Sequence, residues 1–161
     1  MVKEIERKWV SEEPIDNIHS EIIVNTLILE GFMNAIISEY LCKDKSKEIV
    51  TLFLEKESFT FEERIRSFRA LKLYDLSGCP ICKDDYNLYL SKIVYIQKIR
   101  NQIAHNLIKI QDDKYVSKKP LSGDIKELDD NFMEKFRENY SSSMNNFLSP
   151  LINFIRSFNK K

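Results

Sequence analysis

The residues best suited to chemistry in this chain stand in the segment from Arg100 to His105. They combine a guanidinium, an amide and an imidazole. The apolar neighbours of Arg100 at helical spacing are Ile93 and Ile96 before it and Ile103 and Leu107 after it. Arg100 therefore interrupts the apolar stripe of a predicted helix. Because an unpaired buried cation is very costly, Arg100 needs either a fixed anionic partner or a cleft where an anion binds.

Two side chains near Arg100 extend this chemistry. Asn101 and His105 are four residues apart and share a helix face, so the amide can orient the imidazole. Arg100 and His105 are five residues apart, which places them roughly 140° from each other around a straight helix. One phosphate can meet both groups only if the helix ends or bends here, or if a second copy of the motif completes the site.

Basic residues accompany the motif, since the stretch from Tyr86 to Gln111 contains no acidic residue. The candidate contacts to phosphate groups are Lys92, Lys98 and Lys109 and, from a preceding helix, Arg66 and Arg69. A neutral core helix with a few solvated lysines explains the same stretch equally well. The net charge is zero, with 25 Lys+Arg and 25 Asp+Glu. That balance argues against a protein that coats nucleic acid indiscriminately.

Helices are the elements predicted to position these residues, because only three Gly and four Pro occur in 161 residues. The helices are predicted over residues 15–41, 47–57, 60–73, 84–105 and from Asp124 or Asp129 to Phe158, the last one kinked or split at 141–146 and at Pro150. Residues 109–123 are predicted to form a loop. The predicted fold is all-α, an antiparallel bundle of four to five helices in one domain over residues 1–161, with its core at about 14–158.

The third predicted helix has the clearest boundary signals. Thr60 and Glu63 form a capping box at its start, and Gly78 is expected to stop it. Arg64, Arg66, Arg69 and Lys72 follow one another in it without an intervening acid. A solvated face is the favoured interpretation of these cations, and a phosphate-facing strip is the alternative.

The first predicted helix is apolar over most of its circumference between Ile22 and Leu41. We expect one side to lie in the core and the other to make a dimer contact. Its polar residues form only a narrow strip: Glu21, Asn25, Glu30, Asn34 and Ser38. With no run of about 18 consecutive apolar residues and no apolar signal region, the sequence predicts a cytoplasmic protein without a membrane span.

The cysteines are predicted to have no metal site. Cys79 and Cys82 have the spacing of a thiol pair, but a zinc site needs four ligands, and neither Cys42 nor the two histidines lie at ligand spacing. The favoured interpretation is an incidental loop that leads into the fourth helix. A zinc site shared across a symmetric dimer is the alternative. No cofactor is expected.

The motif resembles the signature of the HEPN superfamily, Arg-x4-6-His. Here Asn101 directly follows the Arg, Ala104 precedes the His, and the motif lies late in a helical chain of domain size. The resemblance implies a homodimeric, metal-independent endoribonuclease, often a toxin or antiviral effector, that cleaves RNA by transesterification to a 2′,3′-cyclic phosphate. It implies that Arg100 clamps the phosphate, that His105 transfers protons, and that Asn101 fixes the imidazole or contacts the scissile region.

Alternatives to catalysis remain open. In the HEPN subgroup paired with small nucleotidyltransferases, a modified Tyr follows two residues after the His, whereas Asn106 and Leu107 follow His105 here. Other HEPN members are non-catalytic modules that bind RNA, a nucleotide or a protein. A helical interaction domain unrelated to HEPN, using the first helix as its contact surface, is a third hypothesis. The expected partners are RNA and a second copy of the chain, with an antitoxin or other regulatory protein possible.

Overall fold

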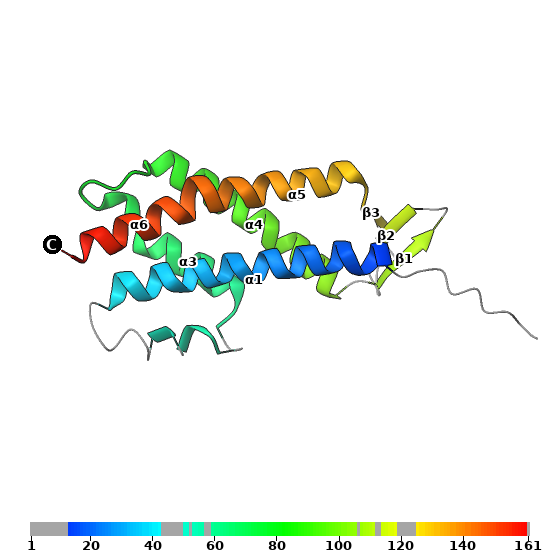
Figure 1. Cartoon of the computed structure of the whole chain (residues 1–161), viewed down its shortest axis with the longest axis horizontal. Helices are drawn as coiled ribbons and strands as arrows, with labels where there is room; N and C mark the ends of the chain where they lie inside the picture. The colour runs from blue at the N-terminus through cyan, green and yellow to red at the C-terminus, as the bar shows by residue number, and fades with distance from the viewer. Residues whose placement is uncertain are drawn as a thin grey trace, which may run out of the picture.

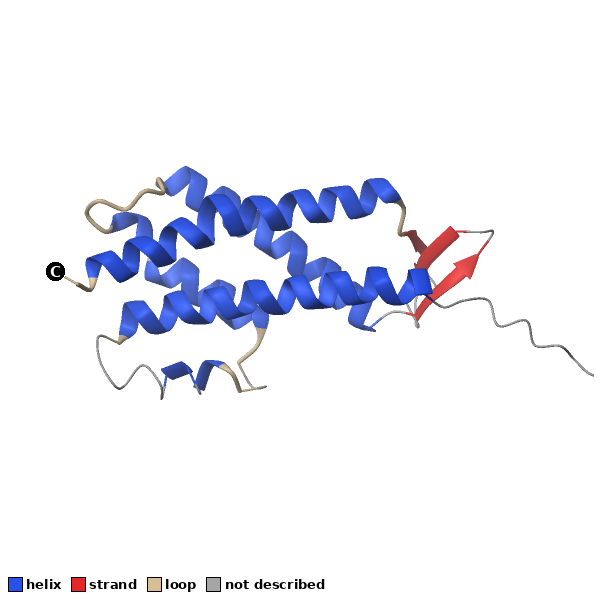
Figure 2. Ribbon diagram, viewed as in Figure 1, coloured by secondary structure: helices blue, strands red, loops and turns tan. Residues whose placement is uncertain are grey.

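The computed structural model describes residues 13–42, 50–51, 53–56, 59–105, 107–111, 114–118 and 125–160. Within these residues the protein is mostly helical, as predicted, and its helices lie side by side in an elongated bundle (Figure 1). A small three-stranded sheet lies at the end of the bundle away from the C-terminus (Figure 2). The predicted second helix falls partly outside the described residues.

Helix α1 (Glu13–Leu41) runs the length of the bundle and packs against α3 (Phe61–Leu71), α4 (Lys83–His105) and α6 (Ser149–Phe158). Its buried apolar face consists of Ile22, Leu29, Met33, Ile36 and Ile37. These positions follow the helical spacing of three, four and seven residues, so one face of α1 enters the core. Tertiary packing of this face stabilises the helix.

Helix α3 begins as the capping box predicted. The Glu63 amide donates to the Thr60 hydroxyl at 3.3 Å, and the Thr60 amide donates to the Glu63 carboxylate at 2.6 Å. The predicted end was wrong, because α3 stops at Leu71 and Lys72 adopts a left-handed conformation with φ of 43°. A short 3-10 turn, η1 (Leu73–Asp75), follows, and Gly78 lies beyond it with φ of 81°.

The prediction of a loop at 109–123 was wrong for the residues that the structure describes. Strands β1 (Leu107–Gln111) and β2 (Lys114–Lys118) pair antiparallel, with Leu107 opposite Lys118, and β3 (Ile125–Glu127) pairs with β2. Two residues connect β1 to β2, which is the commonest length for a hairpin. Leu107 therefore begins a strand and does not extend the apolar stripe of α4.

The C-terminal helical region is interrupted where the sequence predicted a break. Helix α5 (Asp130–Ser143) starts at the N-cap Asp129, whose side chain accepts from the Phe132 amide at 2.7 Å. A π-helical turn, η2 (Met144–Leu148), then leads into α6, where Pro150 occupies the first turn. Proline has no N–H to donate, so the regular α-helical hydrogen-bond ladder cannot continue through this position.

The core lies between α1, α3, α4 and the α5–α6 region. An aromatic cluster joins α3, α4 and the turn η2: Phe68, Tyr86, Tyr89 and Phe147. The buried Tyr86 hydroxyl donates to the Phe68 carbonyl at 2.7 Å and so ties α4 to α3. This packing fixes the first turns of α4 against α3 and the α5–α6 region.

Candidate functional site

Arg100 points out of the apolar seam of α4 into an open pocket. Its neighbours Ile96, Ile99 and Ile103 are buried, whereas Arg100 is only half-buried. Its guanidinium donates to the Asn101 side-chain oxygen at 3.2 Å. Among the described residues this is its one hydrogen bond. The sequence left two possibilities for Arg100, and the structure places it at a cleft.

The pocket has a volume of about 720 Å³ and lies between α1, the start of α3 and α4. Its α1 wall contains Leu27, Glu30, Gly31 and Asn34, and its α4 wall contains Gln97, Arg100 and Asn101. The segment that leads into α3 closes it with Glu55, Lys56, Phe59 and Thr60. This volume lies within the range of natural ligand sites.

Arg64 contradicts the prediction of a solvated face. It is 6% exposed and forms an ion pair with Glu30 at 3.2 Å. Its Nε donates to Asn34 Oδ1 at 2.7 Å, one terminal nitrogen donates to the Leu54 carbonyl at 2.6 Å, and the other donates to the Phe59 carbonyl. The physical reason is that a buried guanidinium with several acceptors is satisfied, so it can anchor α3 to α1 and to the preceding segment.

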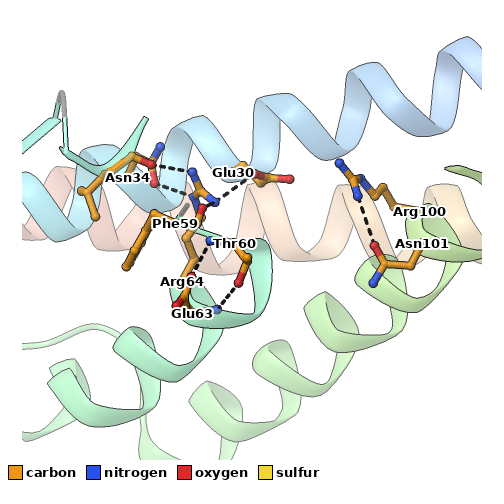
Figure 3. Close-up of polar contacts among 9 residues, drawn as sticks. Glu30, Asn34, Phe59, Thr60, Glu63, Arg64, Arg100 and Asn101 are labelled. Atoms are coloured by element: carbon orange, nitrogen blue, oxygen red, sulfur yellow. Dashed lines mark hydrogen bonds and ion pairs between the residues drawn. The ribbon is translucent and has the colours of Figure 1, made fainter. Parts of the chain in front are cut away.

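Glu30 lies between two guanidinium groups, that of Arg64, which it contacts, and that of Arg100 on the facing wall (Figure 3). Burial raises the pKa of the Glu30 carboxyl above its ordinary value, and the charges of Arg64 and Arg100 oppose that rise. Burial also lowers the pKa of Arg64, against the effect of Glu30. The carboxylate that could have neutralised Arg100 is therefore already held by another arginine.

Asn101 lines the pocket beside Arg100, whereas His105, further along α4, does not. Lys98, Asn101 and His105 are all exposed, and their spacing of three and four residues places them along one face. His105 is the last residue of α4 and does not line the pocket. The structure therefore brings Arg100 and Asn101 together, and it leaves His105 outside the pocket of the same subunit.

The other candidate RNA contacts are scattered. Arg66 and Arg69 are exposed on α3, and Arg66 pairs with Glu62 at 2.6 Å. Lys92 is directed elsewhere, because its ammonium donates to the Ser142 hydroxyl at 2.8 Å and lies 5.5 Å from the centre of the Tyr89 ring. Lys109 belongs to β1, and its side chain lies outside the described residues. Among the candidates whose side chains the structure describes, Lys98 is the one on the exposed face of Asn101 and His105.

Sequence reasoning did not connect Asn34 or Gln97 with Arg100, although both line the pocket. Glu30 and Asn34 belong to the narrow polar strip of the otherwise apolar α1. Their spacing of four residues, on a helix with so few polar positions, was a signal that this strip faces other polar groups. Gln97 stands three residues before Arg100, which places it on the same side of α4.

The face of α1 beside the pocket exposes large apolar side chains. Val24 is 52% exposed, Leu27 is 56% exposed and Ile28 is 43% exposed. Leu27 and Gly31 also line the pocket, so the apolar face and the pocket are continuous. Residues Asn17–Leu41 are long and apolar enough to span a membrane by length and composition, a test that core helices of soluble proteins also pass.

The cysteine pair lies where α4 begins. Cys79 is half-buried, Cys82 is exposed, and the Cys82 sulfur accepts from the Asp85 amide at 3.4 Å. Among the described residues, no group of three or more His, Cys, Asp or Glu side chains is arranged to hold a metal ion. Cys82 therefore contributes to the first turn of α4.

Comparison of the chain with protein-family models, with curated proteins and with solved structures gave no match. The HEPN resemblance therefore depends on the residues of the motif alone.

Proposed function

We propose that this protein is a metal-independent endoribonuclease of the HEPN type, which acts as a homodimer on single-stranded RNA. A toxin or antiviral-defence effector in the cytoplasm is the role that fits this activity. The observation that supports this proposal is the position of Arg100. It lies within the apolar seam of α4, opens onto a pocket, and has no carboxylate within ion-pair distance among the described residues. A guanidinium in that position is available to bind a phosphate.

The chemistry follows from the groups present. The ribose 2′-hydroxyl loses its proton and attacks the adjacent phosphorus, the bond to the 5′-oxygen breaks, and that oxygen takes up a proton as it leaves. The products are a 2′,3′-cyclic phosphate and a 5′-hydroxyl. His105 transfers protons, and Arg100 stabilises the charge that develops on the phosphate. Asn101 holds the Arg100 guanidinium by its side-chain oxygen.

A homodimer can bring Arg100 and His105 to the same phosphate, although the two side chains of one subunit point in different directions. Within one subunit Arg100 and His105 are directed roughly 140° apart around α4. A second subunit can supply the His105 that faces the Arg100 of the first. The exposed apolar face of α1, which is continuous with the pocket through Leu27 and Gly31, supports such an association because contiguous exposed apolar residues mark interaction sites.

The test is cleavage of single-stranded RNA by the purified protein in excess chelator. We expect cleavage to persist under these conditions and to be lost in both Arg100→Ala and His105→Ala. His19→Ala is the matched control, because His19 is also exposed but stands on α1. The corresponding DNA should stay intact, since it has no 2′-hydroxyl. Unchanged cleavage in either Arg100→Ala or His105→Ala contradicts the proposal.

One observation favours a second candidate, a non-catalytic module that binds RNA, a nucleotide or a protein. His105 does not line the pocket that contains Arg100. If the chain is monomeric in solution, the pocket retains its anion-binding arginine but has no imidazole. Binding of RNA that depends on Arg100, without cleavage at any protein concentration, identifies this alternative.

A further inference from the structure

We propose that the pocket beside Arg100 holds a nucleobase next to the scissile phosphate, and that Glu30 selects a base with amino and ring N–H donors, guanine above all, over uracil. This inference rests on the proposed function and adds a substrate preference to it. It assigns the interior of the pocket to a base and the Arg100 side to the RNA backbone.

The first argument is that the Glu30 carboxylate is held in a fixed position. Its Oε2 lies 3.2 Å from Arg64, and the Glu30 side chain is only 14% exposed. Arg64 is itself fixed by Asn34 and by two backbone carbonyls. A carboxylate oriented in this way recognises a ligand at a low cost in side-chain entropy.

The second argument is that the interior of the pocket does not suit a phosphate. Glu30, Glu55 and Glu62 all line it, and the acceptors around Arg64 already occupy that cation. Negative groups close together are unfavourable, so a phosphate is expected to stay with Arg100, away from Glu30. A neutral group that offers hydrogen-bond donors is the better occupant of the α1 side.

The third argument is the match between these groups and base edges. A carboxylate only accepts hydrogen bonds, and the ion pair with Arg64 is made at Glu30 Oε2. Guanine offers an amino group and a ring N–H side by side, cytosine and adenine offer one amino group, and uracil places carbonyl oxygens beside its single N–H. The amides of Gln97 and Asn101 on the opposite wall can serve the remaining polar atoms of the base.

The first experiment sequences the cut sites in a random single-stranded RNA pool. We expect guanine to exceed uracil at one position next to the cut by about tenfold, and Glu30→Gln to remove most of that preference. Glu21→Gln is the matched control, because Glu21 is on the same helix and also pairs with an arginine, Arg137 at 2.6 Å, but lies outside the pocket. Equal use of guanine and uracil by the wild type, or a preference unchanged in Glu30→Gln, overturns the inference.

The second experiment measures binding and does not need cleavage. Calorimetry with guanosine and uridine monophosphates, as 3′ and 5′ isomers, is expected to show about tenfold tighter binding of at least one guanosine isomer. Glu30→Asp, which keeps the charge but withdraws it by one methylene, replaces Glu30→Gln if the latter does not fold. Equal binding of guanosine and uridine to the wild type contradicts the base pocket. Selective binding without any RNA cleavage supports the pocket and contradicts the nuclease proposal, so the two failures are distinguishable.

Discussion

Glu30 of α1 and Arg64 of α3 form an ion pair at 3.2 Å, and this pair determines what Arg100 can do. Arg100 stands on the facing wall of the same pocket, where Glu30 is the α1 carboxylate that lines it and that feels the charge of Arg100. Because Arg64 holds that carboxylate from the buried side, Arg100 keeps its hydrogen-bonding capacity for a ligand. The pair therefore anchors α3 to α1. By engaging Glu30, it also leaves Arg100 available to bind a ligand.

Removing Arg64 is expected to destabilise the fold strongly. Arg64→Ala leaves the Glu30 carboxylate without its ion-pair partner and removes the donors to Asn34 and to two carbonyls. Breaking a buried pair from one side costs about 3 kcal/mol or more in the free energy of unfolding. Urea denaturation measures this loss. The control is Arg66→Ala, whose exposed pair with Glu62 should change the free energy of unfolding by no more than about 0.5 kcal/mol.

Glu30 and Glu21 should make the free energy of unfolding change with pH in opposite directions. Burial raises the pKa of Glu30 above its ordinary value of 4.5, so between that value and the raised pKa the folded state holds a proton that the unfolded state has released. The stability of the wild type relative to Glu30→Gln should therefore fall as the pH rises from about 4.5 through the raised pKa.

Glu21 provides the opposite case on the same helix. Its hydrogen bond with Arg137 lowers its pKa below 4.5, so its contribution is present above that pH and is lost as the pH falls through the lowered pKa. Chemical denaturation of the wild type, Glu30→Gln and Glu21→Gln between pH 3 and pH 8 measures both effects. If the two variants change the pH dependence of stability in the same direction, burial does not determine the pKa of Glu30.

The local parts of the fold could be predicted from the sequence because their signals lie within a few residues. The capping box at Thr60 and the break before Pro150 are of this kind. The β1–β2 hairpin was missed although Ile108 and Ile110 alternate with polar residues, because so short an apolar pattern fits a loop or a strand. The strands become recognisable only through their pairing.

The site was predictable only in part for a related reason. The unusual position of Arg100 within an apolar stripe could be seen from spacing alone. The burial of Arg64 could not, because its acceptor Asn34 lies 30 residues away in the sequence, and a row of cations on one helix ordinarily indicates a solvated face. Which arginine receives the carboxylate is decided by how α1 and α3 pack.

Gly31 is expected to be dispensable for folding. It lies within α1, and a Cβ atom at this position would meet no heavy atom within 4 Å. Gly31→Ala should therefore raise the free energy of unfolding by about 0.5–1 kcal/mol, because glycine within a helix is entropically costly. Thermal or urea denaturation at a concentration where the protein is monomeric measures the effect. A loss of stability would show that this backbone position needs a glycine for a reason within the subunit.

The exposed face of α1 is expected to mediate the association that the nuclease needs. Leu27→Asp places a charge in that face beside the pocket, so it should convert a dimer to a monomer and reduce RNA cleavage by at least about tenfold. Sedimentation velocity gives the oligomeric state, and the chelator-resistant assay gives the activity. Leu88→Asp is the control, because Leu88 is 52% exposed but stands near the start of α4, away from this face. A dimer that survives Leu27→Asp, or one that is lost equally in Leu88→Asp, contradicts this interface.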